Sequence, residues 1–133
     1  MKSFSQSNRP QRNVALLATG YGAFFLLILW AAYTNNLPLQ FLGKFPYYDK
    51  IGHVVLYAIA SYLGHRVLNY RHFRGLRSLP IFPVLFGLTM AAEEIVQGLS
   101  PHRTLDSLDL VCSLAGVIVG YLIAQSTQPS QPN

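Results

Sequence analysis

Four long apolar runs follow one another along this chain of 133 residues, and shorter polar segments separate them. The runs cover residues 14–33, 51–68, 79–99 and 105–124. Each is close to the roughly 20 residues that an α-helix needs to cross the hydrocarbon core of a membrane. The pattern therefore predicts an all-α membrane protein with four transmembrane helices.

The first run also allows an interpretation as a signal peptide, because basic residues precede it. It is longer than the roughly 7–15 apolar residues of a signal-peptide core, and no small-residue cleavage site follows it. We therefore expect residues 14–33 to form a helix that stays in the mature protein. Cytoplasmic tails without regular structure are expected at both ends, over the basic residues 1–13 and the polar residues 125–133.

Polar segments connect the runs. Residues 34–48 contain asparagines, prolines and a glycine, which favour a loop. The segment between the second and third runs is a basic loop that holds Arg71, His72, Arg74 and Arg77. On this basic side we expect His65 and His72 to lie at the membrane–water interface. Pro80 falls in the first turn of the third run, where proline is tolerated.

The charge distribution predicts the orientation. Hydrophobic residues make up 51% of the chain and charged residues only 11%, against roughly 25% charged residues in a soluble domain. With both termini in the cytoplasm, seven of the ten Lys and Arg residues lie inside and three outside. Cytoplasmic segments of membrane proteins are enriched in basic residues, so we expect an N-in, C-in topology. The net charge of +5 is then a topology signal and does not indicate nucleic-acid binding.

The five acidic residues occur at ends of the runs that meet on one side. Asp49 precedes the second run, and Glu93 and Glu94 lie near the end of the third. Asp106 and Asp109 open the fourth run. In a four-helix topology these ends share the outer side of the membrane. Carboxylates beside apolar segments are costly unless they are paired or hydrated, so we expect an outward-facing polar cleft.

Helical spacing indicates which side chains share a face. Asp49, His53 and Tyr57 are four residues apart and form one stripe on the second helix. On the fourth helix, a stripe runs from acidic to small residues through Asp106, Asp109, Ser113, Gly116 and Gly120. Small residues at this spacing allow a neighbouring helix to approach closely. The face that packs into the bundle is therefore also the face that presents the carboxylates.

These stripes and the nearby cations define the candidate ligand-binding residues. Glu94 is one turn from Gln97, and we prefer it to Glu93 as the acid that faces the cleft. Arg103 is able to bind a carboxylate through two parallel hydrogen bonds, which Lys50 is not. The candidate set is Asp49, Lys50, His53, Tyr57, Glu94, Gln97, Arg103, Asp106, Asp109 and Ser113.

Structural roles compete with ligand binding at several of these positions. Thr104 and Asp106 carry side chains that commonly cap a helix N-terminus. Lys50 and Arg103 would serve equally as counter-ions for the acids. The whole cluster would then be an ion-pair lock that holds the four helices together.

The residue types predict no metal and no cofactor. A zinc site usually needs three or four ligands with histidine or cysteine prominent, whereas this cluster offers one histidine among carboxylates. The single cysteine, Cys112, excludes an intramolecular disulfide, and we expect it to fill space in an apolar run. Acid–base catalysis by Glu94 and His53 stays open, because these side chains donate and accept protons in enzymes.

The order and spacing of these residues resemble the VanZ-like family of small bacterial membrane proteins. The matching segments are Asp49-Lys50-x-x-His53-x-x-x-Tyr57, Glu94-x-x-Gln97 and Arg103-x-x-Asp106-x-x-Asp109, followed by Gly116. The family commonly has asparagine four residues after the last aspartate, where this chain has Ser113. This departure favours a hydrogen-bonding role at the position over chemistry that requires asparagine.

The resemblance implies a multi-pass protein of the bacterial inner membrane, linked to susceptibility to the glycopeptide teicoplanin. We expect the outward cleft to bind an envelope component, such as a wall precursor or a lipid headgroup. In this scheme the two cations contact anionic groups and the carboxylates accept hydrogen bonds. A membrane enzyme that uses Glu94 and His53 on a lipid-linked substrate is the alternative, and the ion-pair lock without a ligand is another.

Overall fold

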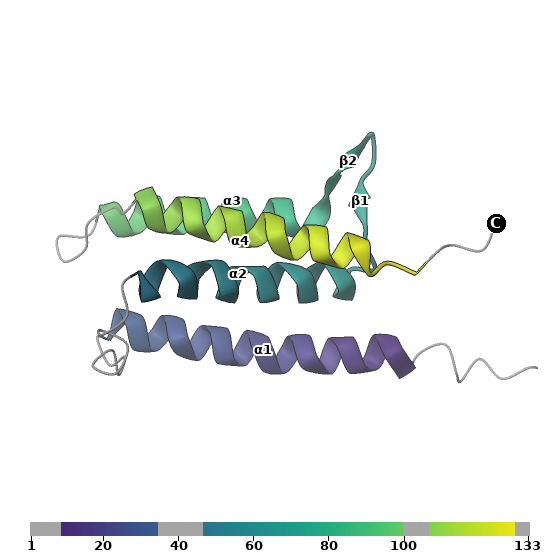
Figure 1. The fold of residues 1–133 in the computed structure, drawn as a ribbon, viewed down its shortest axis with the longest axis horizontal. Helices are drawn as coiled ribbons and strands as arrows, with labels where there is room; N and C mark the ends of the chain where they lie inside the picture. Colours follow the sequence, from purple (N-terminus) through teal and green to yellow (C-terminus); the bar gives the residue numbers. More distant parts are fainter. Residues whose placement is uncertain (1–8, 35–46, 100–106, 130–133) are drawn as a thin grey trace, which may run out of the picture. The chain divides into compact units, whose positions relative to one another are not determined.

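Four α-helices and a small β-hairpin make up the part of the chain that the computed structural model describes, residues 9–34, 47–99 and 107–129. The elements are α1 (Arg9–Tyr33), α2 (Tyr48–Val67), β1 (His72–Phe73), β2 (Leu76–Pro80), α3 (Ile81–Gly98) and α4 (Ser107–Ser126) (Figure 1). The expectation of four helices is confirmed, and the hairpin is an addition to it. The chain divides into two units, Met1–Pro46 and Tyr47–Asn133, and each is described by itself.

The first unit contains α1, which begins earlier than the apolar pattern predicts. The helix starts at Arg9, so residues 9–13, expected in the N-terminal tail, are helical. Pro10 lies in the first turn, where its missing N–H removes no helical hydrogen bond and its fixed φ suits the helix. The polar start of α1 is therefore compatible with helical structure.

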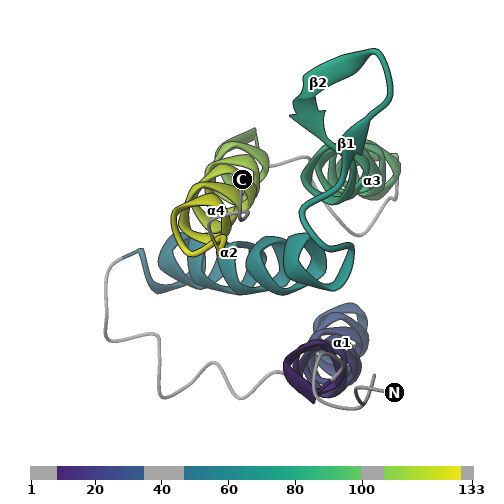
Figure 2. The same ribbon diagram turned by 90° about the vertical axis from the view of Figure 1, so that its right-hand side faces the viewer.

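In the second unit, α2 and α4 lie side by side, and α3 lies on the same side of α2 as α4 does (Figure 1, Figure 2). The glycines of α4 bring its backbone against that of α2. A methyl group on Gly116 would come within 2.5 Å of the Val54 carbonyl oxygen, and one on Gly120 would lie 2.9 Å from the Ala58 carbonyl carbon. The prediction that the small residues of this stripe permit a close helix contact is confirmed.

A buried hydrogen bond crosses the same contact. Ser61 on α2 is fully buried, and its Oγ donates to the carbonyl oxygen of Val117 on α4 at 2.7 Å. A buried hydroxyl without a partner would destabilise the fold, so this bond favours one register of the two helices. The middle of the α2–α4 contact is thus tightly packed and specific.

Three of the described helices, α1, α3 and α4, are long and apolar enough to cross a membrane. α2 is not among them, because Asp49, Lys50 and Arg66 make it more polar than the others. The sequence pattern predicts four spans without this distinction. Polar side chains of α2 contact α4, so the polarity of this helix is partly enclosed in the bundle.

The basic segment between α2 and α3 is more ordered than the expected loop. Its strands form an antiparallel pair in which His72 lies opposite Pro80 and Phe73 opposite Leu76. Gly75 at the turn has φ 87°, a conformation that glycine adopts without strain. Residues 79–80, predicted to start the third helix, belong to β2 instead, because Pro80 is the extended residue before α3.

Candidate functional site

The end of the second unit where α2 and α4 begin and α3 ends is here called the acidic end. Asp49, Glu93, Glu94 and Asp109, the acidic residues that the structure describes, all lie there. The prediction that they share one end of the bundle is confirmed for these four residues. Arg103, Asp106 and the proposed cap Thr104 lie outside the described residues.

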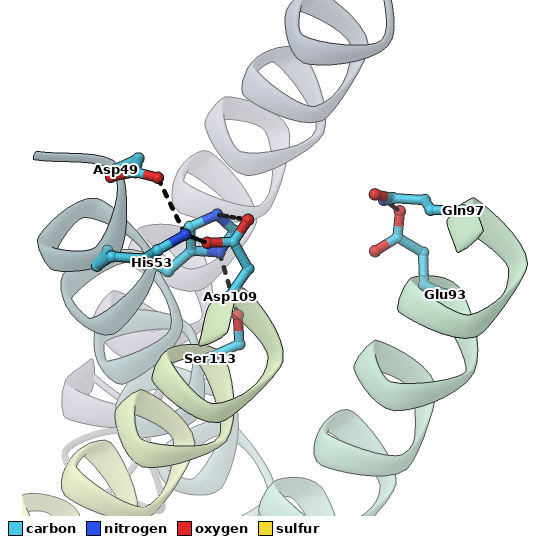
Figure 3. A network of polar contacts seen from close by, with 7 residues as sticks. Asp49, His53, Glu93, Gln97, Asp109 and Ser113 are labelled. Carbon is cyan, nitrogen blue, oxygen red and sulfur yellow. Dashed lines mark hydrogen bonds and ion pairs between the residues drawn. The ribbon is translucent and has the colours of Figure 1, made fainter. Parts of the chain in front are cut away.

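Lys50 links the two helices at the acidic end. Its Nζ donates to Asp109 Oδ1 on α4 and lies 3.1 Å from Asp49 Oδ2 on its own helix (Figure 3). The side chains of Lys50 and Asp109 are only 19% and 23% exposed, whereas that of Asp49 is 49% exposed. Removing one partner of such an enclosed ion pair leaves the other charge poorly solvated. The ammonium group of Lys50 is therefore occupied by carboxylates of this chain.

The same lysine acts on the titration of Asp49, which precedes the apolar part of α2. Partial burial raises the pKa of this carboxyl, but the hydrogen bonds and positive charge of Lys50 lower it by more. The pKa of Asp49 consequently lies below its ordinary value. At neutral pH this exposed carboxylate is an ionised hydrogen-bond acceptor.

His53 continues the network one turn deeper. Its Nδ1 lies 3.1 Å from Ser113 Oγ, and its Nε2 lies 3.8 Å from Asp109 Oδ2 (Figure 3). A proton on Nε2 faces the carboxylate favourably, so the neutral ring is expected to accept the Ser113 hydroxyl proton at Nδ1. The ring also stacks on Tyr57 at 5.8 Å between centroids and 7° between planes. The imidazole is thereby positioned from three sides.

The His53 ring lies between the Ser113 hydroxyl and the Asp109 carboxylate, which is the arrangement of side chains in the catalytic triad of a serine hydrolase. The surroundings do not suit that chemistry, because Ser113 is only 5% exposed and lies inside the α2–α4 contact. Backbone N–H groups within an α-helix are already hydrogen-bonded and are not available to stabilise an oxyanion. We therefore interpret the three residues as a hydrogen-bonded network and not as a nucleophilic triad.

The α3 residues form a second group of side chains. Gln97 Nε2 donates to Glu93 Oε1, and Figure 3 shows both side chains extending from α3 toward the α2–α4 network. Glu94, which we expect to face the cleft in preference to Glu93, is half-buried. The hydrogen bond to Glu93 follows from the spacing of four residues, which brings side chains together on a helix. Both glutamates thus stay candidates for the site.

Charge decides what this end of the molecule is able to bind. The described part of the acidic end holds four carboxylates and the single ammonium of Lys50, a net charge of −3 with His53 neutral. Hydrogen-bond donors and cations are therefore the complementary groups. In the part of the chain that the structure describes, no group of three or more His, Cys, Asp or Glu side chains is placed to hold a metal ion.

The opposite end of the unit holds a cluster that the sequence interpretation missed. His65 is fully buried among protein side chains. Its ring makes edge contacts with Tyr70, His72 and Tyr121 at centroid distances of 5.4, 5.7 and 5.2 Å. The signal was available, because the series Asp49, His53, Tyr57, Ser61 and His65 keeps a spacing of four residues along all of α2.

The comparisons with known proteins add no identification. No family model, no curated protein and no solved structure matches this chain. The functional interpretation therefore rests on the residues and their geometry.

Proposed function

We propose that this chain is a VanZ-like multi-pass membrane protein whose acidic end binds a component of the cell envelope. The observation that supports the proposal is the network that joins Lys50 to Asp49 and Asp109. Enclosed ion pairs stabilise a fold little better than apolar residues of the same volume would. An apolar chain that places its charges in such a network is expected to use them for recognition.

The proposal includes an N-in, C-in topology with four membrane-spanning helices. α2 crosses together with α4, which covers part of its polar side through the contacts of Lys50, His53 and Ser61. The basic residues at the end of α2 and in the hairpin then face the cytoplasm, as the charge rule requires. The acidic end faces outward, in the bacterial inner membrane.

The charge of the acidic end narrows the ligand chemistry. Because two carboxylates occupy Lys50, we assign the main contacts to Asp49, Glu94 and Asp109 as acceptors. Their partners are hydroxyl, amide or amine groups of a wall precursor or a lipid headgroup. Arg103 would hold an anionic part of the same ligand. This arrangement agrees with the link to glycopeptide susceptibility that the VanZ-like resemblance implies.

The two alternatives make different use of the same residues. An enzyme would use Glu94 and His53 as acid and base, and Asp109 also lies near His53, with its Oδ2 3.8 Å from Nε2. It predicts that purified protein converts a lipid-linked substrate and that His53→Ala abolishes turnover with folding intact. An ion-pair lock predicts that substitutions in the network lower thermal stability and change nothing else.

One set of variants separates binding from the alternatives. We expect Glu94→Gln and Arg103→Gln to change glycopeptide susceptibility of cells that produce the protein, while thermal stability in detergent changes little. Arg74→Gln, which removes a basic residue at the other end of the unit, is the matched control and should leave susceptibility unchanged. Unchanged susceptibility in both test variants, with normal insertion, would show that the binding role is wrong.

A further inference from the structure

The second unit has a basic end opposite the acidic end, where α2 terminates and the β1–β2 hairpin connects it to α3. Residues 66–80 contain four arginines, Arg66, Arg71, Arg74 and Arg77, and no acidic residue. The Arg71 and Arg74 side chains are exposed. The hairpin therefore presents positive charge that no carboxylate in its own segment neutralises.

Exposed apolar side chains lie beside these arginines. Leu76 is 58% exposed and Leu79 is 40% exposed, and both belong to β2. Arginine combined with exposed leucine is typical of segments that lie at the boundary between lipid headgroups and acyl chains. A surface that binds free anions in water would have no use for the leucines.

The base of the hairpin is anchored to the helices. His72 Nδ1 lies 2.9 Å from the Tyr70 carbonyl oxygen, and the backbone N–H of Ile81 donates to the Arg71 carbonyl at 3.0 Å. The buried ring of His65 packs against Tyr70 and His72, so the last turn of α2 holds the start of β1. On α4, Gln125 Nε2 lies 3.4 Å from His72 Nε2.

Two residues at the start of the hairpin have left-handed backbones, which supports this anchoring. Asn69 has φ 55° and Tyr70 has φ 57°. Residues other than glycine adopt this conformation at a cost in free energy, so surrounding contacts must maintain it. The backbone N–H of Tyr70 donates to the His65 carbonyl at 2.9 Å and supplies one such contact. The exposed arginines therefore extend from an anchored support.

We propose that the β1–β2 hairpin docks on the anionic lipids of the leaflet into which α3 and α4 emerge at this end. Arg71 and Arg74 contact lipid phosphates, and Leu76 and Leu79 insert at the level of the acyl-chain boundary. The occupant is the lipid surface because charge, exposed leucines and position at the helix ends all agree with it. The inference adds a lipid contact to the proposed function and does not depend on what the acidic end binds.

A fluorescent reporter on the hairpin tests the proposal. Ser78→Cys in a Cys112→Ser background, labelled with an environment-sensitive dye, is placed in nanodiscs of phosphatidylcholine with increasing phosphatidylglycerol. Both leaflets of a nanodisc have the same composition, so orientation does not affect the result. We expect a blue shift of the emission as phosphatidylglycerol increases, and a weaker shift at high salt.

Neutral variants then identify the residues. We expect Arg71→Gln/Arg74→Gln to raise the phosphatidylglycerol fraction at half-shift about tenfold or to abolish the shift. Arg9→Gln/Arg12→Gln removes the same charge from α1 and should keep the wild-type response. Equal emission in both lipids, or an undiminished response in the hairpin variant, would overturn the proposal. A shift produced by inorganic phosphate in phosphatidylcholine nanodiscs would also overturn it, because a free anion would then suffice.

Discussion

The two ends of the second unit differ in how the polar side chains of α2 are satisfied where α2 meets α4. At the acidic end the polar residues are paired across the helices, through Lys50 with Asp109 and His53 with Ser113. At the basic end His65 is fully buried, and neither ring nitrogen has a hydrogen-bond partner among the described residues. The polar side chains that face α4 at the first end are bonded and partly exposed, whereas His65 at the second end supports the hairpin through ring packing.

The middle of the contact explains how two such ends coexist. Gly116, Gly120 and Ser61 bring the helix backbones together between them. Tight packing at this point separates the ends, so they are expected to respond to substitution independently. One polar stripe on α2 thus forms an ion pair and a hydrogen bond with α4 at one end and packs against the hairpin at the other.

The largest effect is expected in the middle. Gly120→Ala places a methyl group against the Ala58 backbone, which has no flexible side chain to move away. We expect a loss of about 3 kcal/mol in the free energy of unfolding or a failure to fold. Gly22→Ala in α1, where nothing lies within 4 Å, is the matched control. It should be neutral or stabilising, because alanine favours a helix. Equal melting temperatures of both variants in detergent would contradict the helix contact.

The acidic end should show the next largest effect. Lys50→Met leaves Asp109 enclosed without its cation, and we expect a loss of about 2 kcal/mol in stability. The double variant Lys50→Met/Asp109→Leu removes both charges and should recover most of that loss. Chemical or thermal unfolding of the two variants measures the difference. A double variant that is less stable than Lys50→Met would show that the pair does not form as described.

At the basic end, in contrast, removal of a buried polar side chain should cost little or no stability. His65→Phe removes two buried nitrogens without hydrogen bonds and keeps an aromatic ring, so stability is expected to stay within about 1 kcal/mol of wild type or to rise. His53→Phe loses the bond to Ser113 and should reduce stability by about 1 kcal/mol. Melting temperatures of both variants check the contrast. A loss in His65→Phe that exceeds the loss in His53→Phe would indicate that His65 has a bonded partner.

The smallest effect concerns pH. The pKa of Asp49 in the folded protein lies below its ordinary value, because Lys50 outweighs partial burial. Its contribution to stability is therefore present above the ordinary pKa and lost as the pH falls through the lowered value. Asp49→Asn should lower stability slightly at neutral pH and should weaken the loss of stability on acidification below about pH 4. An acid unfolding profile identical to that of the wild type would contradict this contribution.

The sequence predicted the elements whose pattern is strong. Four long apolar runs gave four helices, and the glycine spacing on the last run identified the face that meets α2. The charges of the acidic end could be located because helix ends on one side of a bundle must converge. These features follow from helical periodicity alone.

The remaining features depend on tertiary contacts. The sequence does not predict the hairpin, because its strands are short and the segment is basic. It therefore lacks the alternation of apolar and polar residues that indicates a strand. Spacing alone does not separate Glu93 from Glu94, because both lie about one turn before Gln97, and the hydrogen bond of Gln97 is to Glu93. The burial of His65 comes from the packing of the hairpin and α4 against it, which a pattern along one helix does not contain.

The central claim is that the acidic end binds an envelope component, and direct binding tests it best. The melting temperature of purified protein is measured with and without a lipid-linked wall precursor, because a ligand that binds the folded state raises it. We predict a rise for the wild type and for Arg71→Gln at the basic end, and no rise for Asp49→Asn at the acidic end. No rise in the wild type, or an equal rise in Asp49→Asn, would contradict the account.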